Sequence, residues 1–389
     1  MKILFLSYYF EPDLGAGAFR NTALANELSK TYKEIEIDVC STAPIRYDTY
    51  KKTFNISEKK ENLIINRFET VKSSSSFFNH ILSFFIFAWK VKKFVKGKKY
   101  DLVFASSSRL MTAFLGANIA KSKKCILYLD IRDIFRDVLR EMNKVIFFLT
   151  FPFFYLIEIY TIKKARKINL VSEGFEPYFK KNFPNSDLSF FTNGIDHDFL
   201  ELNNKILNKK NKKINILYAG NIGLGQSLEN FLPKLAKKLK YSHEFNVIGD
   251  GGKKKELKSK IEEDNICNII LKNPMTREDL IEEYLKADIL FLHLNNLEAF
   301  EKVLPSKIFE YAAMNKPILA GVSGFAKDFM TKNISDCVFF SPGKIDEAYL
   351  AINNIKLNEE INRIKFIENF SRKKIMVNLA KDIYSILYG

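Results

Sequence analysis

Cysteine is scarce in this sequence, and the positions of the few that occur exclude two classes of protein. The four residues, Cys40, Cys125, Cys267 and Cys337, form no C-x-x-C pair and have no accompanying histidine pair. Structural zinc sites and disulfide-rich scaffolds both need such spacing. We therefore expect neither, and scattered thiols are typical of the reducing cytosol.

An uninterrupted hydrophobic run long enough to cross a membrane is also missing. A helical span needs about 20 consecutive apolar residues. Residues 77–94 are interrupted by Asn79, and residues 145–162 are interrupted by Pro152 and Glu158. Because lysines close both segments, each fits either a core helix or an amphipathic helix that lies on an anionic membrane.

Negative charge is in deficit, since 45 aspartates and glutamates face 61 lysines and arginines, for a formal net charge of +16. Such an excess predicts attraction to an anionic partner, or else a lysine-rich solvated surface. The sequence has no basic stripe with interleaved aromatic residues, so we expect no nucleic-acid binding. With 389 residues, 47% of them hydrophobic, the chain is long enough for two domains with full cores.

The first half of the chain alternates apolar strands with helices. Residues 1–12 lack the cleavage pattern of a signal peptide and predict a first buried strand, which a helix over 21–30 follows. Further strands are expected at 101–106, 124–133, 167–172 and 189–193. Continuous apolar strands joined by helices predict a parallel sheet that is covered on both faces.

The same pattern begins again after a polar stretch. Strands are expected at 214–220, 244–252, 266–273, 287–294 and 317–321, and a helix at 227–239. We therefore predict an α/β fold of two tandem Rossmann-like, doubly wound domains that face one another across a cleft. The predicted parts are a first domain at 1–198, a linker at 199–213, a second domain at 214–370, and a C-terminal helix at 371–389 that packs back on the first domain.

Each predicted domain has glycines between its first strand and its first helix. They are Gly15 and Gly17 in the first domain, and Gly220, Gly223 and Gly225 in the second. Such a loop lets backbone N–H groups and a helix N-terminus approach a phosphate, although a tight turn explains glycines equally well. Neither loop has the dinucleotide fingerprint GxGxxG or the P-loop spacing GxxxxGK.

The segment VLPSKIFEYAAMNKPILAG, residues 303–321, places a cation and an anion three positions apart. Residues at this spacing share one face of a helix. Lys307 and Glu310 are therefore expected to point the same way. They form either an ordinary solvent-facing ion pair or two parts of a binding site near the end of a strand.

This segment, with the strand before it, resembles the nucleotide-sugar motif of glycosyltransferase family 4, whose members are retaining enzymes of the GT-B fold. In that family a helical glutamate seven residues before a proline binds the ribose hydroxyls, and Glu310 and Pro317 have this spacing. The resemblance covers most of the chain through YYFEPDLGAGAFR, LDIRD, FFTNGID, YAGNIG and VIGDG. The order PSK, E and Y on the helix is typical of the branch that builds bacterial O-antigen and capsule.

The resemblance implies a nucleotide-sugar site whose residues can be assigned one by one. They are Gly17, Gly220, Asn221, Gly223, Gln226, Asn273, Met275, Glu301, Ser306, Lys307 and Glu310. One departure concerns the glutamate that the family usually has eight positions before Glu310, because Lys302 stands there. Glu298 or Glu301 would have to take its place in binding the donor sugar.

A second departure concerns the charge of the diphosphate. The arginine and lysine that usually neutralise it correspond to Asn221 and Gln226. Lys307 is then the expected cation, so that Glu310 binds the ribose while Lys307 binds the diphosphate. Negative charge develops on the departing phosphate oxygen, and donors fixed around it supply the main stabilisation. We expect the N–H groups of Gly223–Gly225, the following helix and Lys307 to do so without a metal.

Acidic residues of the first domain and the hinge have other expected roles. Asp133 matches an aspartate of the polysaccharide branch and could orient the acceptor or the donor-sugar hydroxyls, although an arginine–aspartate cap of the next helix explains it equally well. We assign catalytic roles to Asp133 and Lys307. Asp196 and Asp198 have the DxD spacing of metal-dependent transferases, but they lie in the predicted hinge, so we expect no metal site.

These interpretations predict a metal-independent retaining glycosyltransferase that needs no cofactor. The expected donor is a nucleotide-diphospho-sugar, with UDP as the commonest nucleotide of this branch, and the expected acceptor is a polyprenyl-diphosphate-linked glycan. Positive charge and the two apolar segments predict a cytoplasmic protein in peripheral contact with the inner face of the cell membrane. Two alternatives remain open: a nucleotide-sugar 2-epimerase of the same fold, and a non-catalytic sugar-binding protein.

Overall fold

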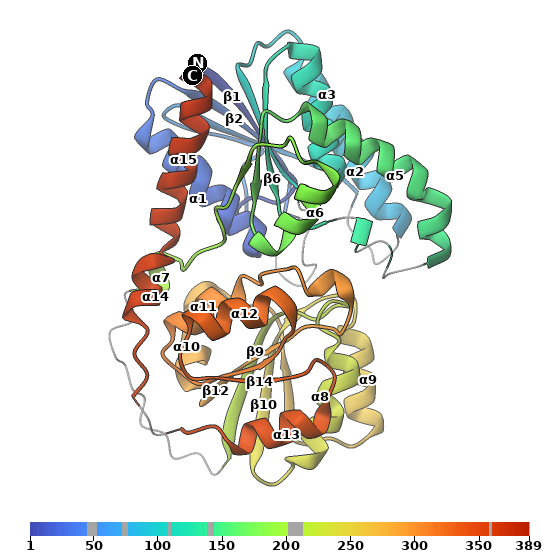
Figure 1. Ribbon diagram of the computed structural model, residues 1–389, viewed down its shortest axis with the longest axis vertical. Coiled ribbons are helices and arrows are strands. Elements are labelled where there is room, and N and C mark those ends of the chain that lie inside the picture. The colour runs from blue at the N-terminus through green and yellow to red at the C-terminus, as the bar shows by residue number, and fades with distance from the viewer. Residues whose placement is uncertain are drawn as a thin grey trace. The chain divides into compact units, whose positions relative to one another are not determined.

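The computed structural model describes residues 1–44, 53–71, 77–107, 110–134, 136–137, 140, 144–200, 213–357 and 360–388. The chain divides into two compact units, Met1–Asn193 with Arg372–Gly389, and Gly194–Ser371 (Figure 1). The first predicted domain extended to residue 198, whereas the N-terminal segment of the first unit ends at Asn193. Of the predicted linker, residues 201–212 lie outside the described part of the chain.

The first unit contains an eight-stranded sheet in the order β3-β4-β2-β1-β5-β6-β7-β8. Neighbouring strands are parallel except for the antiparallel pair of β3 and β4. The strands are β1 (Lys2–Ser7), β2 (Glu36–Thr42), β3 (Ser57–Lys60), β4 (Leu63–Phe68), β5 (Leu102–Ser107), β6 (Ile126–Ile131), β7 (Lys167–Leu170) and β8 (Leu188–Ser189). The helices are α1 (Ala16–Thr31), α2 (Phe77–Val95), α3 (Leu110–Lys123), α5 (Lys144–Lys164), α6 (Glu176–Asn182) and α15 (Arg372–Tyr388), with a 3-10 turn η1 (Glu173–Phe175).

The central strands of this sheet are apolar because helices cover both of its faces. β1, β5 and β6 are buried along nearly their whole length. α1 and α15 cover one face, and α2, α3 and α5 cover the other (Figure 1). The rings of Tyr32 and Tyr384 stack at 4.0 Å where α15 lies along α1. The last helix of the chain therefore belongs to the first unit.

The second unit contains a six-stranded parallel sheet in the order β11-β10-β9-β12-β13-β14. The strands are β9 (Ile214–Asn221), β10 (His243–Asp250), β11 (Ile269–Lys272), β12 (Ile289–His293), β13 (Ile318–Gly321) and β14 (Cys337–Phe340). The helices are α7 (His197–Leu200), α8 (Leu228–Lys238), α9 (Lys254–Glu263), α10 (Arg277–Lys286), α11 (Lys307–Ala313), α12 (Gly324–Asn333), α13 (Ile345–Asn353) and α14 (Ile364–Asn369), with a 3-10 turn η2 (Glu298–Phe300).

The order of these strands fixes where a ligand can bind. α8, α9 and α13 pack on one face of the second sheet, and α10, α11 and α12 pack on the other. The chain runs outward from β9 to β11 and then returns to β12 on the opposite side of β9. A doubly wound sheet binds its ligand at this reversal point, beyond the carboxyl ends of the strands. The predicted fold class, two Rossmann-like parallel-sheet units, is confirmed.

Several predicted elements differ in their limits. α1 begins at Ala16 rather than at residue 21, so Gly17 belongs to the first turn of a helix and not to a loop. The strand predicted at 189–193 is only the short β8, Leu188–Ser189. The strands β2, β3, β4 and β14 were not predicted.

The second apolar segment of the sequence forms α5. Glu158, which interrupts this segment, is buried and accepts a hydrogen bond from the Tyr178 hydroxyl at 2.8 Å. Burial raises the pKa of the Glu158 carboxyl. Within the residues that the structure describes, no helix combines the length and the apolar character needed to span a bilayer.

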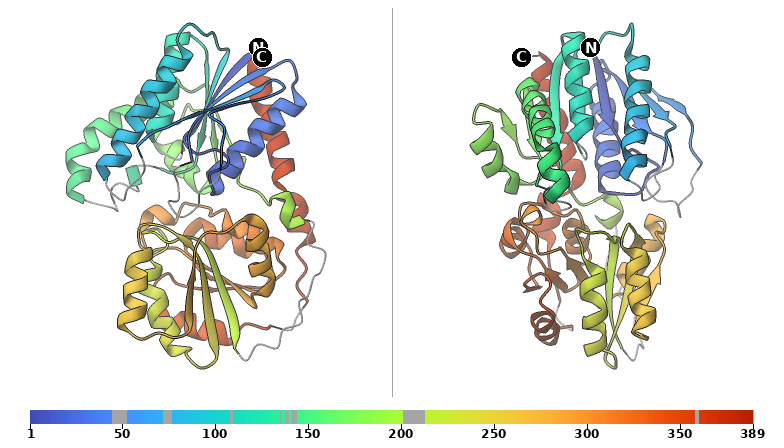
Figure 2. Two further views of the ribbon diagram at one scale, coloured as in Figure 1. Left: turned by 180° about the vertical axis from the view of Figure 1, so that it is seen from behind. Right: turned by 90° about the vertical axis from the view of Figure 1, so that its right-hand side faces the viewer.

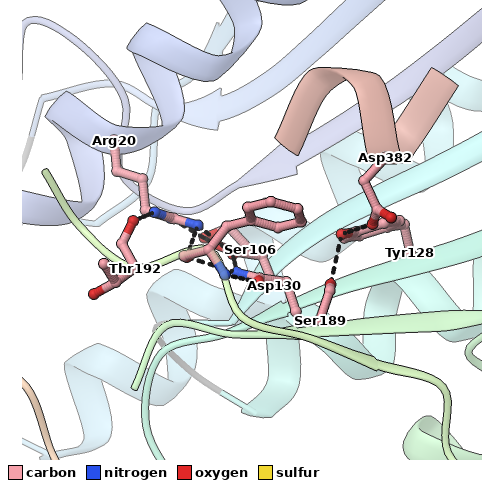
Figure 3. A network of polar contacts seen from close by, with 9 residues as sticks. Arg20, Ser106, Tyr128, Asp130, Ser189, Thr192 and Asp382 are labelled. Carbon is pink, nitrogen blue, oxygen red and sulfur yellow. Dashed lines mark hydrogen bonds and ion pairs between the residues drawn. The ribbon is translucent and has the colours of Figure 1, made fainter. Parts of the chain in front are cut away.

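A buried ion pair connects several elements of the first unit (Figure 3). Arg20 of α1 donates to both carboxylate oxygens of Asp130 in β6, from Nη2 at 2.9 Å and from Nε at 3.2 Å, and both side chains are fully buried. Ser106 of β5 and Asn169 of β7 donate to the same carboxylate at 3.3 and 2.7 Å. Arg20 also donates to the carbonyl oxygens of segment 191–192. This ion pair therefore connects α1 with the strands β5, β6 and β7 and with segment 191–192.

We expect Asp130→Asn to lower the free energy of unfolding by about 3–5 kcal/mol, because it leaves the Arg20 guanidinium buried without a counter-charge. Urea unfolding followed by circular dichroism measures this change. Glu61→Gln is the control, since it removes the exposed Lys33–Glu61 pair, and such pairs contribute at most about 1 kcal/mol. Similar losses in the two variants would contradict a structural role for the buried pair.

Candidate functional site

The neighbouring strands β9 and β10 each have a glycine just before their last residue. Gly220 pairs with Gly249, and their φ angles are 146° and 152°. A Cβ atom on Gly249 would overlap the carbonyl oxygen of Gly220. Glycine is needed at such positions because the backbone approaches closely and φ is positive. Near the carboxyl ends of both strands, the backbone therefore has two paired positions without side chains, beside the reversal point of the sheet.

Lys307 is the first residue of α11, and its side chain lies against Gly220. A Cβ atom on Gly220 would collide with Nζ and Cε of Lys307. The same Nζ lies 5.7 Å from the centre of the Tyr218 ring. Four positions further on, the Tyr311 hydroxyl accepts a hydrogen bond from the N–H of Ala219 at 3.1 Å. α11 is therefore held against β9 with the Lys307 ammonium at the end of the strand.

Glu310 contacts α10 through Tyr284. The fully buried Tyr284 hydroxyl donates to Oε2 of Glu310 at 3.1 Å. Burial, and then the charge of Glu310, raise the pKa of Tyr284 well above its usual value, so this hydroxyl stays a donor. Glu310 itself is only half-buried. The cation and the carboxylate are thus held by separate contacts, one on β9 and one on α10.

His293, at the end of β12, fixes the glycine loop that joins β9 to α8. Its Nδ1 donates to the carbonyl oxygen of Gln226 at 2.6 Å, while Nε2 accepts from the N–H of Gly343 at 3.1 Å. The ring also stacks on Phe231, with centroids 4.3 Å apart. Burial lowers the pKa of His293 to about 4. The imidazole is therefore neutral, and its tautomer is set by the N–H that it accepts.

Asn295 holds the same loop from the other end. Its N–H donates to the carbonyl oxygen of Gly225 at 2.8 Å, and its Nδ2 donates to that of Leu224 at 3.0 Å. Among the residues that the structure describes, no group accepts a hydrogen bond from the backbone N–H of Gly223, Leu224 or Gly225. These three N–H groups follow one another directly after β9, and runs of successive backbone N–H groups can bind an anion.

Three further predicted residues, Asn221, Gln226 and Asn273, form hydrogen bonds near this loop. Asn221 donates from Nδ2 to Oε1 of Gln226 at 2.9 Å. Asn273, after β11, accepts a hydrogen bond from Lys254 at 2.8 Å, and Lys254 also donates to the carbonyl oxygen of Gly249 at 2.7 Å. Burial lowers the pKa of Lys254. A second ammonium group therefore lies beside the glycine that pairs with Gly220.

The remaining predicted residues of the second unit lie around α11. Ser306 is its N-cap residue, but the Ser306 side chain makes no capping hydrogen bond. Met275 packs against the core cluster that contains Tyr284. Glu301 is exposed, and its carbonyl oxygen accepts a hydrogen bond from the N–H of Phe325 at 2.7 Å.

In the first unit, Arg132 connects the two predicted residues. Its guanidinium occupies the place that a Cβ atom on Gly17 would take. Arg132 and the exposed Asp133 follow β6, and Gly17 follows β1, so all three lie at the carboxyl edge of the first sheet. A side chain at position 17 would therefore have to displace the Arg132 guanidinium.

The DxD pair is engaged by an arginine. Asp196 forms an ion pair with Nη2 of Arg277, and Asp198 forms one with Nε at 2.9 Å. The same guanidinium lies 4.8 Å from the centre of the Phe199 ring. In the described part of the chain, no three histidine, cysteine or acidic side chains are grouped so that they could hold a metal ion.

Four residues that shape this site were missed in the sequence. His293 and Asn295 are polar residues at the carboxyl end of a predicted strand, and Lys254 follows the glycines after another. Polar residues at such strand ends were the available signal. Tyr284 lies inside a helix, and its contact with Glu310 has no counterpart in local sequence.

We expect His293→Phe to keep the stacked ring but to lower the free energy of unfolding by about 1–3 kcal/mol at neutral pH, since two buried backbone groups lose their partner. The folded-state pKa lies below the ordinary 6.5, so this contribution is complete above pH 6.5 and is lost as the pH falls toward 4. Urea unfolding at a series of pH values should show the two proteins converging over this range. A constant difference would show that His293 does not titrate as described.

Two comparisons of the sequence found similarity to glycosyltransferases. Residues 201–373 match the family described as Glycosyl transferases group 1. Over 155 residues the chain is 30% identical to the putative colanic acid biosynthesis glycosyl transferase WcaI of Escherichia coli K12. This match covers 40% of the chain and 38% of the length of that relative.

Solved structures resemble the chain over almost its whole length. Sucrose-phosphate synthase of Thermosynechococcus elongatus has a TM-score of 0.76 at 12% identity, and the match covers 100% of this chain and 99% of that one. HepE of Anabaena in complex with UDP-glucose has a TM-score of 0.69 at 15% identity, with 99% and 100% covered. Likeness at such low identity establishes a fold. The chain therefore has the GT-B fold, and its residues 201–373 are similar to the group 1 glycosyltransferases.

Proposed function

We propose that this chain is a retaining glycosyltransferase that transfers a sugar from a nucleotide-diphospho-sugar to a lipid-linked glycan. The observation that carries the proposal is the Lys307 ammonium against Gly220, with the Glu310 carboxylate one turn further on. A cation at the end of the first strand suits a diphosphate, and a half-buried carboxylate suits the hydroxyls of a ribose. One bound nucleotide can use both.

The charge of the diphosphate needs partners other than Asn221 and Gln226, which are uncharged and bridge to one another. Lys307 would bind the diphosphate directly, and Lys254 adds positive charge at the neighbouring strand end. The N–H groups of Gly223–Gly225 supply donors that do not need to reorganise when negative charge develops. These groups together can stabilise a leaving nucleoside diphosphate without a metal ion.

In the proposed reaction the bond between the anomeric carbon and the phosphate oxygen breaks, while an acceptor hydroxyl oxygen bonds to the same face of that carbon. The departing phosphate oxygen takes the proton of the acceptor hydroxyl, which accounts for retention. Asp133, exposed beside Arg132 at the carboxyl edge of the first sheet, would orient the acceptor. Lys307 would neutralise the departing phosphate.

The donor and acceptor classes rest on related proteins. HepE binds UDP-glucose, and this supports a UDP-sugar as the donor. WcaI is named for colanic acid biosynthesis, and this supports an acceptor in the synthesis of a surface polysaccharide, carried on a polyprenyl diphosphate at the inner face of the cell membrane. The 2-epimerase alternative gains no support from His293, because both of its ring nitrogens are engaged by backbone groups.

We expect calorimetric titration with UDP, GDP, dTDP and CMP to show selective binding of UDP, and EDTA to leave that binding unchanged. Glu310→Gln should weaken UDP on the order of 10- to 100-fold, because a charged hydrogen-bond acceptor is lost. The same substitution should have little effect on 2′,3′-dideoxy-UDP, which lacks the hydroxyls that Glu310 would bind. Equal losses for both ligands would reject the ribose assignment, and absence of nucleotide binding would reject the transferase site.

A further inference from the structure

The outward side of α2 carries large apolar side chains that are open to solvent. Ile81, Leu82, Phe85 and Trp89 are 39%, 50%, 60% and 62% exposed. Leu82, Phe85 and Trp89 are spaced by three and four residues, and Ile81 lies four residues before Phe85, so all four lie along one side of the helix. The opposite side of the helix is buried in the unit and includes Phe84, Phe87 and Val91. This exposure is therefore a property of one helix side and not of a loosely packed helix.

Lysines continue the same side of the helix toward its C-terminal end. Lys92, Lys93 and Lys96 are exposed. Nζ of Lys93 lies 5.6 Å from the centre of the Trp89 ring. Apolar residues, then a tryptophan, then lysines along one helix side are the pattern of a helix that lies in a membrane interface.

α5 repeats the pattern. Phe148, Phe153 and Leu156 are 75%, 60% and 65% exposed, and the exposed Lys163 and Lys164 end the helix. The inward side is again buried and includes Ile157, Thr161 and Ile162. Two helices of the same unit thus share one arrangement of exposed apolar and basic residues.

These two helices lie on the same face of the first sheet, with α3 between them (Figure 2). Each connects two parallel strands and therefore runs opposite to the strands. Their apolar halves begin at the carboxyl edge of the sheet, which is the edge that carries Arg132 and Asp133. The lysines lie toward the other edge.

We propose that the outward sides of α2 and α5 form a docking face for an anionic lipid bilayer; this α2–α5 face consists of Ile81, Leu82, Phe85, Trp89, Lys92, Lys93, Lys96, Phe148, Phe153, Leu156, Lys163 and Lys164. Burial in the interface removes the apolar side chains from water, and the lysines complement anionic headgroups. The inference rests on the proposed function, because a bilayer at this face brings a lipid-linked acceptor to the edge that carries Asp133.

Trp89 makes the face observable without a label, because it is the only tryptophan in the sequence. With vesicles of phosphatidylcholine and phosphatidylglycerol, we expect its emission to shift to shorter wavelength and its quenching by acrylamide to fall. Vesicles of phosphatidylcholine alone should bind the protein much more weakly. Unchanged Trp89 emission on vesicles that do carry the protein down in sedimentation would place the contact elsewhere and overturn the proposal.

Variants separate the two parts of the face. Phe148→Gln with Leu156→Gln should abolish most sedimentation with the mixed vesicles, and it leaves Trp89 in place as the probe. Lys92→Gln with Lys93→Gln should weaken partition about fivefold per lysine. Tyr241→Gln with Leu350→Gln is the matched control, because these residues are 87% and 61% exposed on the second unit. Equal loss in the control would overturn the proposal.

Two further readouts separate this proposal from others. Calorimetric titration with UDP should give the same affinity for the α5 variant as for the original chain, so a failure of nucleotide binding is distinguishable from a failure of docking. Analytical ultracentrifugation without lipid tests a second copy of the chain as the occupant. Self-association that disappears in the α5 variant, together with no vesicle binding, would assign the face to a dimer and reject the bilayer.

Discussion

The Lys307 side chain lies at the end of β9 in space that a side chain on residue 220 would take. A Cβ atom there would occupy the position of the lysine Nζ and Cε, and a Cβ atom on Gly249 would meet the backbone of Gly220 in turn. Tyr311 then holds α11 on the strand, which directs Glu310 toward α10. The positions of the Lys307 ammonium and the Glu310 carboxylate therefore depend on the two paired glycines, Gly220 and Gly249.

The buried charges of the first unit connect its elements, whereas the exposed positive charges are available to partners of the protein. The Arg20–Asp130 pair is fully buried, and neighbouring side chains and carbonyl oxygens satisfy it, so it connects elements of the first unit. The excess of +16 is carried largely by exposed lysines, and some of them extend the apolar sides of α2 and α5. Net charge is thus informative about the partners of this protein and uninformative about its fold.

Apolar runs predicted the central strands because these strands are buried on both faces. The same criterion missed β2, in which Asp38, Ser41 and Thr42 are polar and nevertheless buried, and β4, in which buried and half-buried residues alternate. At the site, the sequence placed Lys307 and Glu310 on one helix, and both belong to α11. Contacts between distant elements, such as that of Tyr284 with Glu310, were beyond prediction because they arise only when helices pack.

We propose that Lys307 supplies the positive charge that Asn221 and Gln226 lack at the diphosphate. Calorimetry should compare the binding of UDP and UMP to the original chain, to Lys307→Ala and to the control Lys302→Ala. We expect Lys307→Ala to remove the preference for UDP over UMP, and Lys302→Ala to keep it. An undiminished preference in Lys307→Ala, or an equal loss of affinity for both nucleotides, would show that Lys307 does not bind the diphosphate.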